Sequence, residues 1–202
     1  MGQEAKCRVR LGKTIAEGRA LLESKELIFR GPDLRLNVPF AEMNSLEAVD
    51  GWLRFKFSQG AAAFELGAQA AKWADTIRNP KSLVDKLGVK PAMLVSVLGI
   101  GDADFRRQLD ATTADVTDRA AKESDIIFLA ADQPQTLEQL RDLSRAIKRN
   151  GAIWVVYPKG QKHITEGAVF AAGKRAGLVD VKVASFSATH TALKFVIPVN
   201  KR

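Results

Sequence analysis

The periodicity of the hydrophobic residues changes at Asn79-Pro80-Lys81, and this change restricts the chain to two different kinds of folding unit. Before it, hydrophobic and polar residues alternate, as in Leu34–Phe40 and Leu53–Phe57, which is typical of strands with one buried face. After it, continuous apolar runs alternate with helical segments, which indicates crossover connections and a parallel sheet. We therefore predict an α+β domain of short strands closed by one helix over residues 1–80, followed by an α/β domain over residues 81–202.

Turn signals divide the first domain into about six or seven short strands. These signals are Gly31-Pro32-Asp33, Asp50-Gly51 and Gln59-Gly60. Asp50-Gly51 predicts a hairpin because glycine accepts a positive φ angle. We interpret Glu17–Glu23 and Lys25–Arg30 as the opening strand pair of this domain.

The hydrophobic period then becomes that of an amphipathic helix. The apolar face of this helix consists of Leu66, Ala70, Trp73, Ala74 and Ile77. Asn79-Pro80 ends the helix because the residue before proline disfavours helical dihedrals.

Short strands followed by one such helix resemble the pleckstrin-homology-like barrel, and the resemblance implies that Trp73 plugs an open end. The basic phosphoinositide loop of that family is absent, because Lys25 alone fills the turn between the two strands expected to come first. For this domain we expect an adaptor or structural role and no binding of lipid headgroups.

In the second domain, strands and helices are predicted to alternate. The predicted strands are Met93–Leu98, Ala114–Val116, Asp125–Ala130, Ala152–Tyr157, Val179–Ser185 and Ala192–Val199. The predicted helices cover residues 81–89, a segment around Phe105 and Leu109, residues 119–123, residues 134–149 and the segment from Thr165 to Gly177. Lys148 and Arg149 are expected at the negative end of the helix 134–149, and Asn150-Gly151 at its C-cap.

A parallel sheet that finishes in an antiparallel strand pair resembles the class I methyltransferase-like Rossmann fold, over about residues 83–199. More narrowly, this domain resembles a family of uncharacterised bacterial proteins with a reduced Rossmann-like domain. The matching stretches are Leu87–Pro91, Asp125–Ile127, Trp154–Lys159, Ala176–Val183 and Ala192–Val196. That family implies a fold and no particular activity.

Gly99 and Gly101 lie directly after the first predicted strand of this domain, where a Rossmann fold binds its nucleotide. Only G-x-G is present, because Asp104 stands where the third glycine of the fingerprint would be. Asp102 places negative charge where a helix N-terminus would favour a phosphate. We interpret this loop as a tight turn, with cofactor binding as the alternative.

An acid that ends the second strand holds the cofactor ribose in methyltransferases, and the nearby acids here are Asp115 and Asp118. Only 25 residues separate Gly99 from Asp125, and this segment is too short for two further strand–helix units. The cofactor pocket is therefore expected to be truncated, and S-adenosylmethionine is not expected to bind; any other cofactor is left undetermined.

Two more polar segments follow predicted strands. Asp132 begins Asp-Gln-Pro-Gln, which is distantly similar to the Asp-Pro-Pro-Tyr motif of amino-methyltransferases but lacks one proline and the aromatic residue. We interpret Asp132 or Gln133 as a helix cap. The basic segment Lys159–His163 is interpreted as a solvated loop. The alternative is a ligand site in which Lys159 or Lys162 holds an anion and His163 transfers a proton near neutral pH.

Ligands of open α/β sheets bind beyond the carboxyl ends of the strands. We therefore expect the Gly99–Asp102 loop, Asp132 and the Lys159–His163 segment to converge at one edge of the sheet. His190, between two threonines, is expected in the turn before the last strand and is not assigned a role.

The composition narrows the possible functions. A single cysteine, Cys7, excludes an internal disulfide, and two histidines with one cysteine give no zinc site. Residues 1–10 lack the apolar core of a signal peptide, and no run approaches the ~18 apolar residues of a membrane span. We therefore expect a cytoplasmic protein.

The net charge of +8 lies mainly in the second domain, which has 19 basic and 13 acidic residues. This excess is compatible with weak binding of nucleic acid or another polyanion, or with simple solubility.

Our leading hypothesis is a non-enzymatic binding or interaction protein with a degenerate methyltransferase-like fold and a protein partner. The alternatives are an enzyme or sensor for a nucleotide-like or anionic small ligand at the strand edge, and a polyanion-binding protein.

Overall fold

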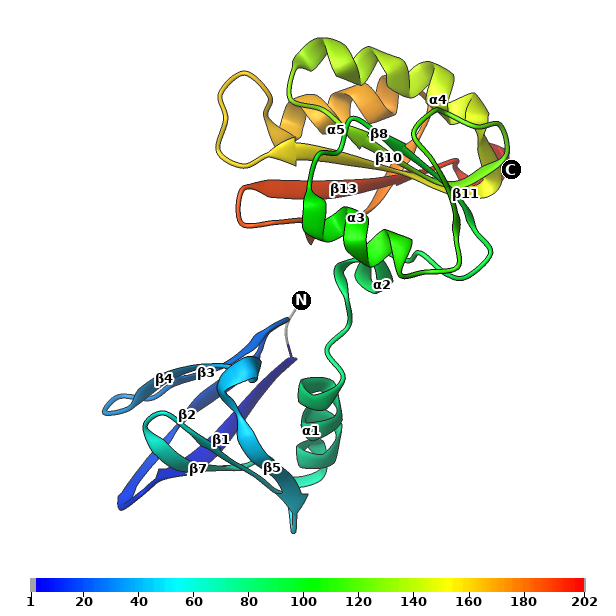
Figure 1. Ribbon diagram of the computed structural model, residues 1–202. Helices are drawn as coiled ribbons and strands as arrows, with labels where there is room; N and C mark the ends of the chain where they lie inside the picture. The colour runs from blue at the N-terminus through cyan, green and yellow to red at the C-terminus, as the bar shows by residue number, and fades with distance from the viewer. Residues whose placement is uncertain (1–2, 202) are drawn as a thin grey trace. The chain divides into compact units, whose positions relative to one another are not determined.

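The computed structural model describes residues 3–201, and the chain divides into two compact units, Met1–Lys81 and Ser82–Arg202. The first unit is a curled antiparallel sheet with one helix (Figure 1). The second unit is a mixed sheet with helices on both faces.

The sheet of the first unit has seven strands in the order β4-β3-β2-β1-β7-β6-β5. The strands are β1 (Gln3–Leu11), β2 (Thr14–Leu22), β3 (Glu26–Arg30), β4 (Arg35–Pro39), β5 (Asn44–Val49), β6 (Trp52–Phe57) and β7 (Gly60–Glu65). The hairpin predicted at Asp50-Gly51 joins β5 to β6. Both turn residues have positive φ angles, 51° and 78°, as a two-residue hairpin turn requires.

The opening strand pair was assigned wrongly from the sequence. The first hairpin is β1 with β2, joined at Gly12 and Lys13, and the pair β2 with β3 comes second. Lys25 therefore does not lie in the turn between the first two strands; Lys13 does. The first strand alternates as a half-buried strand does, with Val9 inward and Arg8 and Arg10 outward.

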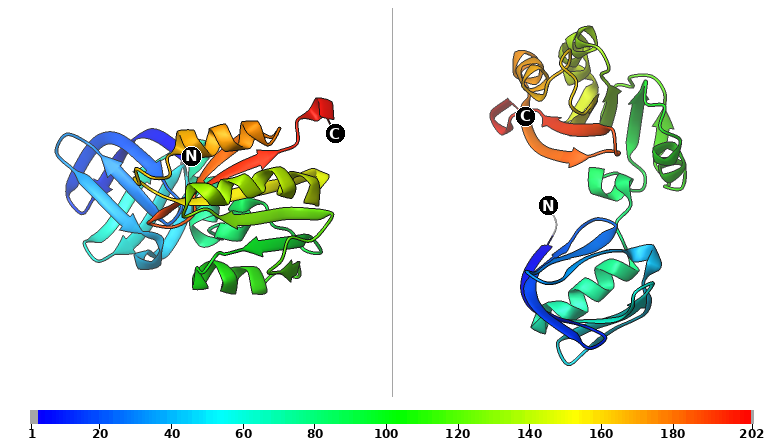
Figure 2. Two further views of the ribbon diagram at one scale, coloured as in Figure 1. Left: turned by 90° about the horizontal axis from the view of Figure 1, so that it is seen from above. Right: turned by 90° about the vertical axis from the view of Figure 1, so that its left-hand side faces the viewer.

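The concave side of this sheet holds one hydrophobic core, which helix α1 (Ala70–Arg78) covers. Figure 2 shows the sheet curving around this helix. The buried face of α1 is Ala70, Trp73, Ala74 and Ile77, as the helical period predicted. Two short 3-10 helices, Phe40–Glu42 and Gly67–Gln69, complete the unit.

The sheet of the second unit has six strands in the order β12-β13-β11-β10-β8-β9. The strands are β8 (Leu94–Leu98), β9 (Asp115–Thr117), β10 (Ser124–Ala130), β11 (Ile147–Pro158), β12 (Val179–Ser185) and β13 (His190–Val196). β9, β8, β10 and β11 are parallel, and β13 is antiparallel to both β11 and β12. The predicted parallel sheet with a final antiparallel pair is therefore present.

Helices cover both faces of this sheet (Figure 1). The helices are α2 (Leu83–Leu87), α3 (Ala103–Asp110), a 3-10 helix (Pro134–Gln139), α4 (Leu140–Ala146), α5 (Glu166–Arg175) and a 3-10 helix (Val199–Lys201). One core lies between the sheet and α4 and α5, and the other lies between the sheet and α2 and α3. Trp154 fixes α2 to the second core, since its indole N–H donates to the Leu87 carbonyl at 2.9 Å.

The short helix predicted at residues 119–123 is absent. The backbone of Ala121 bonds elsewhere: its N–H donates to Ser96 Oγ at 3.1 Å, and its carbonyl accepts from Ser124 Oγ at 2.7 Å. Ser96 and Ser124 are fully buried and their hydroxyls lie 2.9 Å apart. Glu123 has a positive φ of 58°, which a helix does not allow. A buried serine pair therefore determines the path of this loop.

The helix predicted over residues 134–149 ends earlier, at Ala146, and begins as a 3-10 turn. Ile147 starts β11 and pairs with Ser124. Lys148 consequently lies in a strand, where its ammonium bonds to Asp125 at 2.8 Å, and does not cap a helix. This ion pair and the burial of Ile147 override the helical propensity of the segment.

Asp125 links three strands at the amino edge of this sheet. Its carboxylate accepts hydrogen bonds from the Leu94 N–H at 2.9 Å and from Lys148. Burial alone would raise its pKa, but the bonds from Lys148 and Leu94 and the positive charge of Lys148 hold it below the usual 3.8.

Because the folded-state pKa of Asp125 is depressed, the stability it contributes is present above the unfolded pKa and is lost as the pH falls through the folded pKa. We expect Asp125→Asn to lower the free energy of unfolding at pH 7. Urea unfolding should show the gap to the wild type closing below about pH 4. A gap of constant size down to pH 2 would contradict this account.

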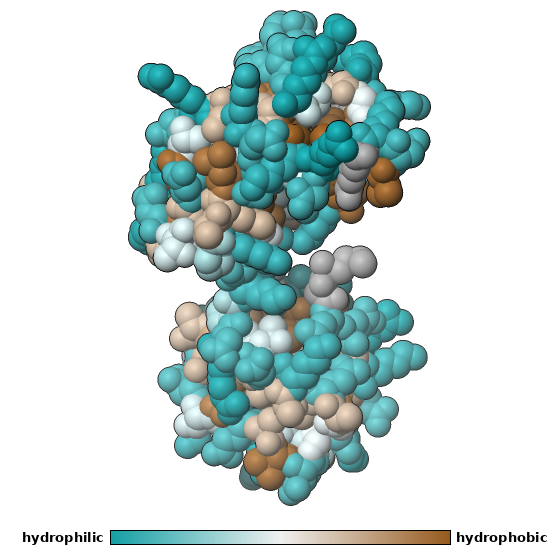
Figure 3. Space-filling model, turned by 90° about the vertical axis from the view of Figure 1, so that its right-hand side faces the viewer, coloured by the Kyte–Doolittle hydropathy of each residue, from teal (hydrophilic) through white to brown (hydrophobic). Residues whose placement is uncertain are grey.

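Within residues 3–201, no helix is both long enough and apolar enough to cross a bilayer. In the view of Figure 3, hydrophilic side chains cover most of the visible surface of each unit, with separate hydrophobic patches between them.

Candidate functional site

The carboxyl ends of the parallel strands of the second unit bring the predicted segments to one edge of the sheet. Gly99 follows β8, Asp132 follows β10 and Lys159 follows β11. β13 is antiparallel, so its first residue, His190, lies at the same edge, opposite Pro158. We call this the carboxyl edge. It is the place where an α/β sheet of this kind binds ligands.

The Gly99–Asp102 loop is a tight turn that leads into α3. Gly99 has a φ of 74°, and a side chain added there would lie 3.5 Å from Ala130 Cβ. Asp102 is the N-cap of α3, and its Oδ1 accepts from the Phe105 N–H at 2.8 Å. The carboxylate thus occupies the position at the helix N-terminus that a phosphate would take.

The structure shows where Asp118 and Asp115, the two acids considered for ribose binding, lie. Asp118 follows β9 and forms an ion pair with Arg106 of α3. Asp115 begins β9, and its backbone N–H bonds to the Met93 carbonyl. Asp115 therefore lies at the opposite end of the strand from the carboxyl edge.

The ammonium group of Lys159 is directed into the turn between β12 and β13. It donates to Ser185 Oγ at 3.0 Å, to the Ser187 carbonyl at 2.7 Å and to the Ala188 carbonyl at 3.4 Å. Three acceptors match the three donors of an ammonium group. Lys159 therefore holds the turn in place, and an incoming anion would have to compete with these bonds.

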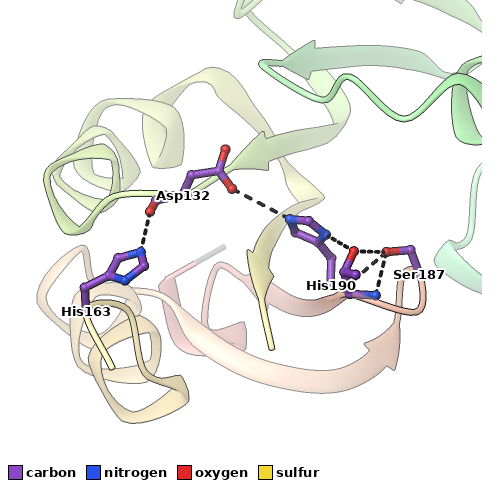
Figure 4. A network of polar contacts seen from close by, with 5 residues as sticks. Asp132, His163, Ser187 and His190 are labelled. Carbon is purple, nitrogen blue, oxygen red and sulfur yellow. Dashed lines mark hydrogen bonds and ion pairs between the residues drawn. The ribbon is translucent and has the colours of Figure 1, made fainter. Parts of the chain in front are cut away.

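Asp132 lies between two histidines, as Figure 4 shows. Its backbone carbonyl lies 3.0 Å from His163 Nε2, and its carboxylate Oδ1 lies 3.7 Å from His190 Nε2. The other ring nitrogen of His190, Nδ1, lies 2.9 Å from Thr189 Oγ1. The carboxylate, imidazole and hydroxyl groups thus form one chain of polar contacts.

Ser187 connects this chain to Lys159. Its hydroxyl accepts from the backbone N–H groups of His190 and Thr189, and its carbonyl accepts from Lys159. Lys162, on the same loop as His163, is exposed, and within residues 3–201 its side chain has no hydrogen bond or ion pair.

Neither Asp132 nor Gln133 caps a helix through its side chain, which corrects the sequence interpretation. Gln133 is the N-cap residue of the 3-10 helix Pro134–Gln139, without a side-chain cap bond. The carboxylate of Asp132 faces His190 instead.

Sequence reasoning assigned no role to Ser187, Thr189 or His190. The signal was available, because an antiparallel final strand begins at the edge where the parallel strands end. A turn before that strand therefore had to lie beside Lys159.

Two hollows on the surface lie away from the carboxyl edge. One, of about 480 Å³, lies between α4 and α5 near Leu137, Arg141 and Ala172. The other, of about 770 Å³, lies on the first unit beside Lys6 and Arg19. In the described part of the chain, no group of three His, Cys, Asp or Glu side chains is placed to hold a metal ion.

Several solved structures are similar to this chain at low sequence identity. An S-adenosylmethionine-dependent methyltransferase from Aquifex aeolicus has a TM-score of 0.48 and 16% identity, over 59% of this chain and 90% of that one. A protein from Pyrococcus horikoshii has a TM-score of 0.43 and 12% identity, over 65% and 92%. A TehB-like methyltransferase from Corynebacterium glutamicum has a TM-score of 0.38 and 13% identity, over 64% and 96%.

No protein-family model matches the chain, and no curated protein matches it. The three structural similarities all have TM-scores below 0.5, which is too low to assign a fold or a function from similarity.

The position of Asp102 gives a test of its role. We expect Asp102→Ala to lower the free energy of unfolding by about 0.5–2 kcal/mol, because the first turn of α3 loses its cap. Asp102→Asn should change it little, since asparagine caps equally well. Chemical denaturation of both variants measures the difference, and equal stabilities would show that the cap does not matter.

Proposed function

We propose that the chain is a non-enzymatic binding or interaction protein, in which a pleckstrin-homology-like β unit precedes a reduced methyltransferase-like α/β unit. The curled seven-stranded sheet covered by α1 supports the first assignment. The parallel strands followed by an antiparallel pair, with β13 between β11 and β12, support the second.

The observation that carries this proposal is that three charged groups at the carboxyl edge already have partners within the chain. Asp102 caps α3, Asp118 pairs with Arg106, and Lys159 bonds to the turn before β13. A cofactor would have to break these bonds before it made its own, which lowers its net affinity.

An edge strand offers a surface for a protein partner. β12 ends the sheet, and its Val179, Val181 and Val183 are 41%, 54% and 50% exposed. An edge strand with apolar side chains accepts an extended segment of another protein as an added strand. We expect Val183→Lys to abolish capture of such a partner, whereas Val49→Lys on the first unit should not.

A thermal-shift panel tests the non-enzymatic assignment. The full chain is heated with S-adenosylmethionine, its demethylated product, nucleotides and dinucleotides. A ligand at about 100 times its Kd stabilises a protein by about 2.7 kcal/mol, so a binder would raise the melting temperature visibly. We expect no shift with any of them. A shift that saturates with one of these compounds would contradict the proposal.

The second candidate is a small-ligand sensor or enzyme at the carboxyl edge. The observation in its favour is the connected chain of Asp132, His190 and Thr189, since imidazole between a carboxylate and a hydroxyl is suited to proton transfer. Under this reading, His190→Gln would abolish ligand binding or turnover at unchanged stability.

A further inference from the structure

The outer face of the sheet of the first unit carries a row of four cationic side chains that crosses four neighbouring strands. Strand register places Lys6 opposite Arg19, Arg19 opposite Arg30, and Arg30 opposite Arg35. We call these four residues the basic row. All four side chains are exposed, and they come from four neighbouring strands, β1 to β4.

This arrangement works against the stability of the sheet. Like charges directly opposite one another on neighbouring strands repel. Within residues 3–201, the row has a single ion pair, between Arg19 and Glu4 at 3.1 Å, and Lys6, Arg30 and Arg35 have none. Internal charge pairing therefore does not account for the row, whereas an external anion would.

Gly18 lets strands β2 and β3 pack closely together at the middle of the basic row. A side chain at Gly18 would lie 2.7 Å from the ring of Phe29 and 2.9 Å from the carbonyl carbon of Arg30. Only glycine allows β2 to approach β3 this closely. The hollow of about 770 Å³ lies over this place, and Lys6, Arg8 and Arg19 line it together with Glu17 and Glu65.

We propose that the basic row binds the phosphate backbone of a nucleic acid, without reading its sequence. Three of the four side chains are arginine, whose planar guanidinium group matches phosphate oxygens in pairs. Neighbouring strands are ~4.8 Å apart, so the row presents four charges along about 14 Å. The row has no aromatic side chain on which a base would stack, so the contacts are to phosphates alone.

The neighbours of the row favour a narrow polyanion over a membrane surface. Glu4 lies two residues before Lys6, Glu17 lies two residues before Arg19, and both are exposed on the same face of the sheet. A broad anionic bilayer would be brought against these carboxylates. A single phosphate backbone would lie along the row, between these two carboxylates. It would replace Glu4 as the partner of Arg19, because an exposed ion pair of this kind is weak.

Fluorescence anisotropy of the full chain with a labelled 20-base-pair DNA duplex tests this proposal between 50 and 300 mM salt. Four phosphate contacts predict a slope of log affinity against log salt of about −3.6. The double variant Arg30→Gln/Arg35→Gln should shift this slope by about +1.8, to about −1.8, and weaken binding at 50 mM salt. Its melting temperature should equal or exceed that of the wild type, because like-charge repulsion is relieved.

The matched control is Lys122→Gln/Lys174→Gln, which removes the same charge from exposed positions of the second unit. This control should leave the slope unchanged. The proposal is overturned if the control weakens binding as much as the row variant, because net charge would then explain the affinity. It is equally overturned if the chain binds phosphatidylserine vesicles or poly-glutamate but not the duplex.

Discussion

Replacing Trp73 with alanine is expected to lower the free energy of unfolding of the first unit by about 3–5 kcal/mol. Trp73 is fully buried at the centre of α1 and is one of the largest side chains in the core of the curled sheet. Its loss removes the largest of the four side chains that α1 buries against the sheet and leaves a cavity in this core. Hydrogen exchange of β1 to β7, measured by mass spectrometry, should report the loss, with β8 to β13 as the internal control.

Trp73→Phe separates packing from hydrogen bonding. In the described part of the chain, the indole Nε1 of Trp73 has no hydrogen-bond partner, so phenylalanine loses packing volume and no bond. Trp154→Phe in the second unit would lose the bond to the Leu87 carbonyl as well. We expect Trp73→Phe to be the milder of the two. Unchanged exchange in Trp73→Ala would mean that α1 is not needed to hold the sheet.

Replacing Gly173 with alanine is expected to destabilise the second unit by about 1–3 kcal/mol, although alanine is the better helix former. Gly173 lies in α5 against the buried ring of Phe195 in β13. A Cβ atom there would come within 2.5 Å of Phe195 Cζ, and a buried ring has little room to move. The helix would have to shift away from the sheet.

Gly167→Ala is the matched control within the same helix. The nearest atom to an added Cβ at Gly167 is Thr165 Oγ1 at 3.9 Å, so alanine meets no clash and should stabilise by up to about 1 kcal/mol. Phe195→Leu should restore part of the stability lost in Gly173→Ala. Urea midpoints for Gly173→Ala, Gly167→Ala and the double variant Gly173→Ala/Phe195→Leu measure these effects, and a stabilising Gly173→Ala would contradict the packing described for α5.

Local patterns predicted the parts of the fold that depend on local chemistry. The apolar face of α1 follows from its helical period, and the β5–β6 hairpin follows from Asp50-Gly51. Thr165 caps α5 as expected, since its hydroxyl accepts from the Ala168 N–H at 3.2 Å.

Errors arose where contacts distant in sequence decide the structure. Helix α4 ends early because Lys148 reaches Asp125, 23 residues away. The loop before β10 is not helical because buried Ser96 holds the N–H of Ala121. Neither contact leaves a local signature in the sequence.

The sequence predicted that the polar segments of the candidate site lie at one edge of the sheet, but it did not predict their bonding partners. The strand order brings Asp132 and Lys159 to the carboxyl edge, as the alternation of strands and helices implied. The partners of Lys159 could not be predicted from the sequence, because they lie 26 to 29 positions away along the chain. The basic row could not be predicted from the sequence either, because it depends on the register of three strand pairs.

The most direct test of the central claim is an amide-resolved NMR titration of the full chain with S-adenosylmethionine. We expect no saturable shift of the Gly99, Gly101 and Asp132 amides up to millimolar ligand, because Asp102 already caps α3 and Lys159 already bonds to the turn before β13. Saturable shifts confined to those amides would show that the carboxyl edge is a working ligand site and would contradict the account.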